Sequence, residues 1–148
     1  MGYDVKDLIK KVLKKGYLIS LATTDDGGPW VSDLIYIYDD NLNIYWMSDP
    51  DVRHSKAILN NSEVAGSITA NHFGEDNLGV QIEGIAEKIE GQRYDLAKKH
   101  FLKRNRPIPK ENEDVLQGNS WYVLKPTKIE LIDEKLFGFD KKVLNPQE

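Results

Sequence analysis

The sequence predicts a mainly β fold, an antiparallel β-barrel with short helices. Strand-like segments follow one another directly in the first half of the chain, joined by short connections rich in Asp, Asn, Gly and Pro. This order favours antiparallel neighbours over a parallel sheet with crossover helices. Some of these segments, such as residues 34–38, carry apolar side chains in both phases. Strands that are covered on both faces, as in a barrel with an outer layer, have this pattern.

The element at the start of the chain is expected to be an amphipathic helix over residues 5–15. Asp4 is suited to cap its first turn, and Gly16 is suited to end it. Lysines occupy the rest of its surface. The helix would therefore cover one side of the sheet with its apolar stripe, which consists of Val5, Leu8, Ile9, Val12 and Leu13.

About seven strands are expected after this helix, and each is bounded by turn residues. The apolar phase of one long strand slips around Gly84, which predicts a β-bulge there. Residues from 133 onward are expected to be irregular. The expected strands cover residues 17–24, 30–38, 42–48, 64–70, 78–89, 121–124 and 128–132.

Two further short helices interrupt the strands. Residues 52–59 form the first, for which Asp51 is the expected cap. Residues 93–103 form the second, which Pro107 and Pro109 bring to an end. Its many Lys and Arg side chains indicate a solvated basic face, with an anion or nucleic-acid contact as the alternative.

Composition restricts the classes of protein. The chain has 148 residues, so we expect a single domain over residues 1–148. The absence of cysteine excludes disulfide scaffolds, thiol nucleophiles and Cys-ligated zinc, and the three histidines lack metal-ligand spacing. A net charge of −4 argues against a dedicated nucleic-acid binder. No apolar run is long enough to span a membrane, and we expect a cytoplasmic protein without a membrane partner.

The segment from Ser48 to His54 is the most informative for function. A strand ends in a hydroxyl, turns through a proline, and enters a helix whose first turn carries Arg53 and His54. Free N–H groups at a helix start, together with a guanidinium and an imidazole, suit a phosphate. In the competing interpretation, Arg53 pairs with an acid such as Asp49 or Asp51, and His54 is a surface residue.

Residues 45–65 resemble the FMN-phosphate signature of the pyridoxamine 5′-phosphate oxidase-like FMN-binding split barrels. Residues 29–34, 82–87 and 121–130 resemble further segments of that family in the same order. Residues 137–142, Phe-Gly-Phe-Asp-Lys-Lys, fit an uncharacterised branch of it. The resemblance covers nearly the whole chain and implies a six- to seven-stranded antiparallel split β-barrel of the FMN-binding type.

The resemblance assigns the phosphate of FMN to Ser48, Arg53 and His54. The best-known oxidases of the family have an Arg where Ser32 stands and a Lys where His54 stands. The site therefore carries less fixed positive charge, and phosphate affinity is expected to fall as His54 loses its proton at about pH 6–7. The substrate-gripping Arg/His pattern near the C-terminus of the pyridoxamine phosphate oxidases is also missing, so that particular activity is not expected.

The resemblance also implies where the flavin ring lies. Backbone groups near Ser32, Asp33 and Leu34 would meet the isoalloxazine edge. Backbone near Gly79 and Val80 would line the site from the other subunit of a homodimer.

The C-terminal lysines complete the implied site, since Lys141 or Lys142 would place a cation near the ring or its phosphate. The implied function is that of an FMN-dependent oxidoreductase that transfers a hydride through flavin N5 to or from an unidentified small molecule. One alternative is a non-catalytic module on the same barrel that stores or senses a flavin, haem or deazaflavin. Another is a structural barrel with a degenerate pocket.

Overall fold

The computed structural model describes residues 2–146, and its strands form one antiparallel sheet. The strands are β1 Leu18–Asp25, β2 Gly28–Ile35, β3 Ile37–Tyr38, β4 Ile44–Ser48, β5 Glu63–Thr69, β6 Leu78–Ile89, β7 Ser120–Asp133 and β8 Lys142–Leu144. The helices are α1 Val5–Lys15, α2 Arg53–Asn60, α3 Tyr94–Lys103 and α4 Glu134–Phe137.

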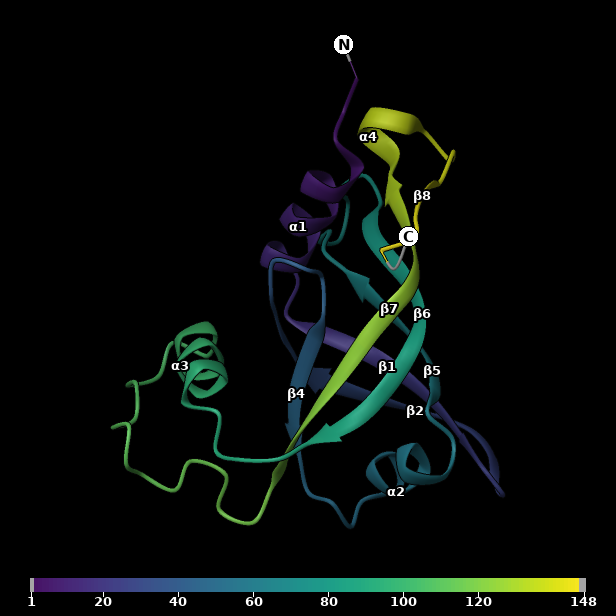
Figure 1. Cartoon of the computed structure of the whole chain (residues 1–148). Helices are drawn as coiled ribbons and strands as arrows, with labels where there is room; N and C mark the ends of the chain where they lie inside the picture. Colours follow the sequence, from purple (N-terminus) through teal and green to yellow (C-terminus); the bar gives the residue numbers. More distant parts are fainter. Residues whose placement is uncertain (1, 147–148) are drawn as a thin grey trace.

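The sheet curls into an incomplete barrel (Figure 1). Its strand order is β2-β1-β5-β6-β7-β4-β3, with β8 added beside β7. Only Tyr36 separates β2 from β3, yet these two strands stand at opposite ends of that order. The chain therefore joins the two ends of the sheet, and a split remains between the outer edge of β2 and β4. This arrangement confirms the mainly β, antiparallel split barrel.

The interior of the curl holds the main core. Alternate residues of β5 point inward, and α1 covers the top with Ile9, Val12 and Leu13. Asp4 caps α1 as expected, because its carboxylate accepts from the amides of Lys6 and Asp7. Burial of this apolar surface is the main stabilising contribution.

The longest strands, β6 and β7, pair along their whole length and contain the expected irregularity. Their register shifts between Glu83 and Gly84. A Cβ at Gly84 would collide with the carbonyl oxygen of Lys125, so the close approach requires glycine. The β-bulge expected at Gly84 is therefore confirmed.

Residues 121–132 form one strand instead of the expected two. Pro126 lies opposite Gly84 at the register shift, where the hydrogen-bond ladder is already irregular. A missing proline N–H is tolerated at such a position, so β7 continues through it. The C-terminal region is not irregular as expected: Asp133 caps α4, and the following chain returns to pair with β7 as β8.

Two further strand boundaries differ from expectation. Residues 30–38 are not one strand, since the chain leaves β1 at Ile35 and joins β4 at Ile37. The strand expected from residue 42 begins at Ile44, because Leu42 has a positive φ of 67°.

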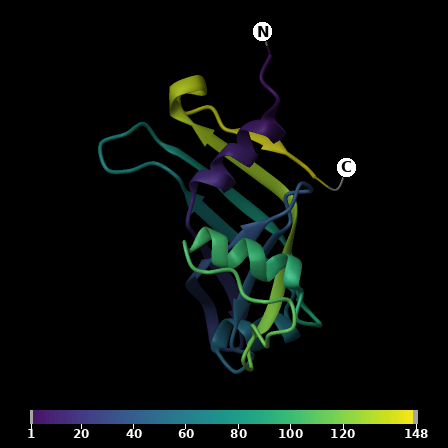
Figure 2. The ribbon, with the colours of Figure 1, turned by 90° about the vertical axis from the view of Figure 1, so that its left-hand side faces the viewer.

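The helix α3 lies beside the barrel over a second, smaller core (Figure 2). Leu96 and Ala97 pack there against Ile37, Leu116 and Trp121. Within residues 2–146, none of the helices has the length and apolar character that a membrane crossing requires.

Candidate functional site

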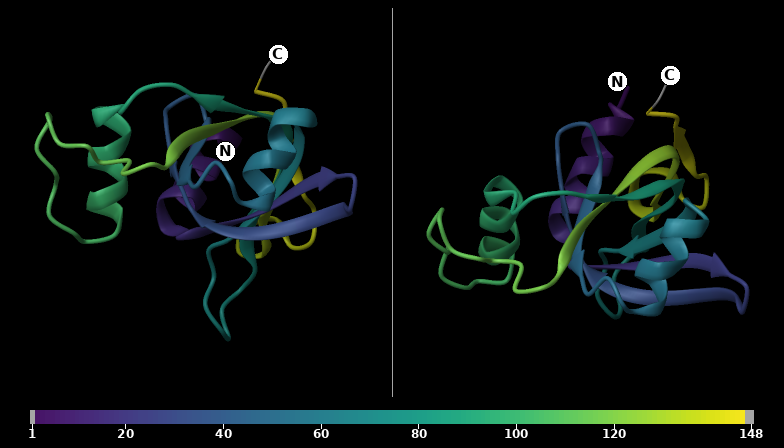
Figure 3. Two further views of the ribbon diagram at one scale, coloured as in Figure 1. Left: turned by 90° about the horizontal axis from the view of Figure 1, so that it is seen from below. Right: turned by 60° about the horizontal axis from the view of Figure 1, so that its bottom comes forward.

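The start of α2 lies at the lower end of the barrel, beside the β1–β2 hairpin (Figure 3). After Ser48 the chain turns at Asp49, whose carboxylate accepts from the amide of Asp51 at 2.8 Å. The helix begins at Arg53 with Val52 as its N-cap, and no side chain caps it. The expected cap, Asp51, is therefore wrong, because the helix starts one residue later than predicted. The first-turn amides remain available to an anion.

Ser48 and His54 form a buried pair at this corner. The distance from Ser48 Oγ to His54 Nε2 is 3.0 Å, and His54 is 8% exposed. The interpretation of His54 as a surface residue is therefore wrong. Burial also lowers the pKa of His54 below its ordinary value, so the ring is neutral at pH 7. The expected loss of its charge at about pH 6–7 is accordingly displaced to lower pH.

Arg53 pairs with neither Asp49 nor Asp51; it pairs with Asp25 at the end of β1. Its Nε and Nη2 donate to the two Asp25 oxygens at 2.9 and 3.1 Å. This ion pair holds the pKa of Asp25 below its ordinary value. Trp30 on β2 lies under the guanidinium, with the ring centroid 4.4 Å from Cζ.

The bidentate pair uses only one edge of the guanidinium. Its other edge, formed by Nη1 and the second Nη2 hydrogen, has no protein acceptor within residues 2–146. A Cβ at Gly27 would lie 2.9 Å from Nη2, so the hairpin fits closely around Arg53. Arg53 is thus held in a fixed orientation by Asp25 and Trp30, with one edge free to bind an external acceptor.

The β2 positions Ser32, Asp33 and Leu34 lie on the strand that borders the split. Their inner edge pairs with β1, while no strand of residues 2–146 pairs with the outer edge. Asp33 Oδ1 accepts from Ser20 Oγ at 2.6 Å, so its side chain is engaged with β1. Backbone groups on the outer edge of β2 are therefore the ones available to a ligand.

Gly79 and Val80 lie near the opposite end of the barrel. Ala22 of β1 pairs with Ala65 of the antiparallel β5. From this pair, Asp25 lies three residues further along β1, toward α2. Thr69, the partner of Gly79, lies four residues further along β5, in the opposite direction. At strand spacing this separation is roughly 20 Å.

The environment of these two residues limits what they can contribute. A Cβ at Gly79 would lie 2.5 Å from the carbonyl oxygen of Ile68, so the close pairing of β5 and β6 requires glycine. Val80 is buried and faces the core. Only backbone atoms of Gly79 and Val80 could therefore line a site.

The two C-terminal lysines lie at the same end as Gly79. Lys141 Nζ donates to Gln81 Oε1 at 2.8 Å and lies 3.5 Å from Glu130. Lys142 pairs with Asp140 at 2.8 Å. Within one copy of the chain, these lysines do not converge with the residues at the start of α2.

Asp25 and Trp30 are the site residues that sequence reasoning did not assign. Asp25 lies 28 residues before Arg53, in a segment that reads as a turn, and no spacing rule relates them. Trp30 lies 23 residues before Arg53 within an expected strand, and no spacing rule relates these two residues either. No cluster of acidic or histidine side chains in residues 2–146 is arranged to hold a metal ion.

Comparisons with known proteins address the fold and the family of the chain. The chain is 28% identical over 142 residues to the UPF0306 protein YhbP of Salmonella schwarzengrund, covering 95% of this chain and 92% of that protein. A haem-binding protein from Mycobacterium smegmatis superposes with a TM-score of 0.76 at 16% identity, over 99% of this chain and 60% of that one. An FAD-binding protein from Mesorhizobium loti superposes with a TM-score of 0.62 at 21% identity, over 82% of this chain and 88% of that one.

These two structural likenesses, both below 25% identity, establish the fold alone. The family described as pyridoxamine 5′-phosphate oxidase matches residues 5–133, which is most of the chain. The chain therefore belongs to the pyridoxamine 5′-phosphate oxidase family.

Proposed function

We propose that this chain is a single-domain FMN-binding protein that works as a homodimer and as a flavin-dependent oxidoreductase. The flavin would lie along the split between β2 and β4, with its phosphate at the start of α2. The single observation that carries the proposal is the oriented Arg53, whose free guanidinium edge adjoins an uncapped helix N-terminus. Both features present N–H donors and positive charge, which suit an anion with several oxygen acceptors.

The residues at this corner fit a phosphate group. Arg53 supplies a guanidinium edge, and the first-turn amides of α2 supply N–H donors with the positive end of the helix dipole. Ser48 and His54 are both buried beside this helix start and lie within hydrogen-bond distance of each other. Because His54 is neutral at pH 7, it would take part as a hydrogen-bonding group.

The edge strand suits the planar part of the cofactor. Backbone N–H and C=O groups along Ser32, Asp33 and Leu34 are the available partners for the polar edge of an isoalloxazine ring. The bound flavin would supply hydride transfer at N5, while the protein binds, orients and shields it. Trp30 borders the same region and would report binding through its fluorescence.

A homodimer would bring the two separated groups of predicted residues together. Strands β1, β2, β5, β6 and β7 share an exposed face with a groove of about 500 Å³ lined largely by small and polar side chains. Val31 is exposed on this face. A second copy packed there by a two-fold axis would place its Gly79 and Val80 backbone, and its Lys141 or Lys142, near the first copy's split.

A non-catalytic binding module is the second candidate, and the charge balance at the site favours it. Asp25 offsets the charge of Arg53, and His54 is neutral at pH 7, so the side chains supply little net positive charge. Such a site could hold a flavin, haem or deazaflavin without turnover. Bound flavin that no reductant and acceptor can cycle would identify this module.

The test compares FMN with riboflavin, which lacks the phosphate. Wild type, Arg53→Ala and the control Arg106→Ala are titrated, with tryptophan fluorescence and the flavin absorption band as readouts. Loss of a charge-assisted phosphate contact should weaken FMN binding roughly tenfold to a hundredfold in Arg53→Ala only, with riboflavin unaffected. Wild type that binds no FMN, or an Arg53→Ala variant with unchanged affinity, refutes the proposal. Analytical ultracentrifugation tests the dimer.

A further inference from the structure

A second cavity lies between α1, β3 and α3. The two helices α1 and α3 face the viewer in Figure 2. Its volume is about 490 Å³, within the range of roughly 300–1,000 Å³ found for small-molecule sites. Leu13 and Ile37 lie at its buried floor, and Leu102 lies at its exposed rim. None of these residues belongs to the proposed flavin site.

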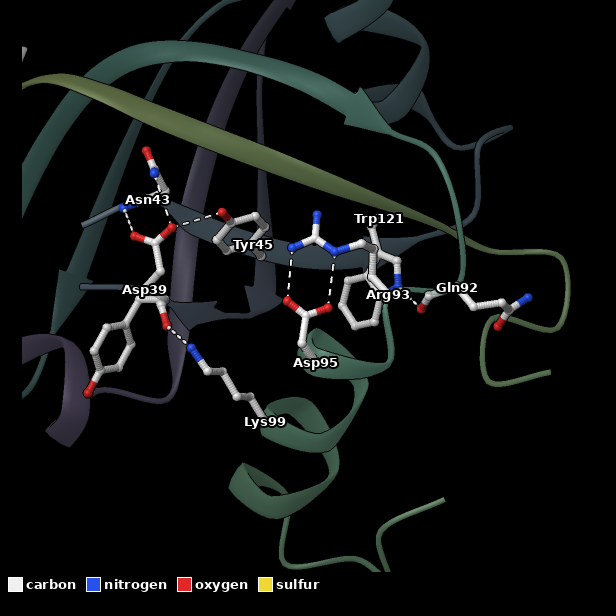
Figure 4. Close-up of polar contacts among 9 residues, drawn as sticks. Asp39, Asn43, Tyr45, Gln92, Arg93, Asp95, Lys99 and Trp121 are labelled. Atoms are coloured by element: carbon white, nitrogen blue, oxygen red, sulfur yellow. Dashed lines mark hydrogen bonds and ion pairs between the residues drawn. The ribbon is translucent and has the colours of Figure 1, made fainter. Parts of the chain in front are cut away.

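Two lysines from successive turns of α3 line this cavity. Lys99 Nζ donates to the carbonyl oxygen of Tyr38 at 3.1 Å, as Figure 4 shows, and Lys103 Nζ donates to that of Tyr36 at 2.5 Å. The Lys103 ammonium also lies 3.3 Å from the centroid of the Tyr36 ring. Each ammonium therefore uses one of its three donors on a neutral carbonyl, and neither forms an ion pair within residues 2–146.

The charge of the cavity is not balanced. Lys14 of α1 contributes a third cation, whereas the acid in the described lining is Asp40. Asp40 is itself 3.7 Å from Lys10, outside the cavity. Burial of Lys103 without a carboxylate lowers its pKa to about 7. Anchoring α3 to the segment 36–38 explains the two carbonyl contacts, but it does not explain a cavity with apolar walls and surplus positive charge.

We propose that this cavity binds an amphipathic monocarboxylate, whose apolar body packs on Leu13, Ile37 and Leu102 and whose carboxylate pairs with Lys103 and Lys99. An incoming carboxylate would supply the anionic partner that the half-buried Lys103 lacks. Apolar walls select for a hydrocarbon or aromatic body over a multiply charged phosphate, which would lose its hydration against them.

The test uses decanoate as the probe, with decanol as its uncharged counterpart, in titration calorimetry at pH 7. Lys103→Met removes the ammonium and keeps an apolar stem. Lys98→Met is the matched control, since Lys98 lies on the same helix with its ammonium over Tyr94, outside the cavity. We expect decanoate to bind wild type and Lys98→Met equally, and Lys103→Met at least roughly tenfold more weakly. Lys103→Arg should restore most of the affinity.

A second readout separates a ligand role from a structural one. In reductively ¹³C-methylated protein, the Lys103 resonance should titrate at about pH 7, and decanoate but not decanol should raise that pKa. The other titratable groups around it are Lys14, Lys99, Asp40, Tyr36 and Tyr38 in the cavity lining, Tyr17, whose ring centroid lies 5.7 Å from its ammonium, and His100 on the same helix. Equal affinity for decanol, equal weakening in both methionine variants, or no binding by folded wild type would each overturn the proposal. Thermal unfolding confirms that the variants are folded.

Discussion

Replacement of His100 by leucine should make the protein more resistant to mild acid. His100 is 4% exposed on α3, where its ring meets the edges of Trp121 and Phe101 at centroid distances of 6.0 and 5.5 Å. Neither ring nitrogen has a hydrogen-bond partner within residues 2–146. The ring is therefore buried in its neutral form, and leucine can occupy the same apolar space without unpaired nitrogens.

The magnitude follows from the pKa of His100. Burial, assisted by the positive charges of Arg104, Lys103 and Arg106, lowers it from 6.5 to about 4. As the pH falls below 6.5, the unfolded chain takes up this proton and the folded chain does not, so stability is lost between about pH 6.5 and 4. At about 1.4 kcal/mol per pH unit, the loss is negligible at pH 7, about 2 kcal/mol at pH 5 and about 3 kcal/mol at pH 4.

Urea unfolding at pH 7, 6 and 5, followed by tryptophan fluorescence, measures this difference. His100→Leu should match or exceed wild type at pH 7 and gain about 2 kcal/mol relative to it by pH 5. His72→Gln, in the exposed β5–β6 loop, serves as the control. If the free energies of unfolding of wild type and His100→Leu differ by the same amount at pH 7, 6 and 5, the reasoning is refuted.

Two further predictions concern the candidate site. Asp25→Asn removes a negative charge beside the free edge of Arg53. FMN should therefore bind roughly threefold to tenfold more tightly at low salt, while riboflavin binding stays the same. Tighter binding of both ligands, seen by fluorescence titration, would contradict an effect on the phosphate. Gly79→Ala should lower the melting temperature measured by circular dichroism. The added Cβ would lie 2.5 Å from the Ile68 carbonyl oxygen, so β5 and β6 would have to move apart. An unchanged melting temperature would argue against that close approach.

Local patterns in the sequence predicted most of the elements, because each depends on residues close together in the chain. The apolar stripe of α1, its cap at Asp4 and the bulge at Gly84 are confirmed for this reason. The helix start at Arg53 and the strand start at Ile44 are local errors of one or two residues, whereas the larger errors lie where a distant partner decides. Pro126 ends a strand in isolation, but opposite the irregular pairing at Gly84 it is tolerated, and β7 runs through. The segment at residues 142–144 becomes a strand only because the edge of β7 is available.

The sequence by itself determined where most of the strands and helices lie along the chain, the turn after Ser48, and the presence of Arg53 and His54 in the first turn of a helix. Only the tertiary structure decided what these side chains do. Folding brings Asp25 and Trp30 of the first hairpin onto Arg53, and it buries His54 against Ser48. Ionisation and orientation depend on neighbours and on water exclusion, which are properties of the packed sheet and not of residue spacing.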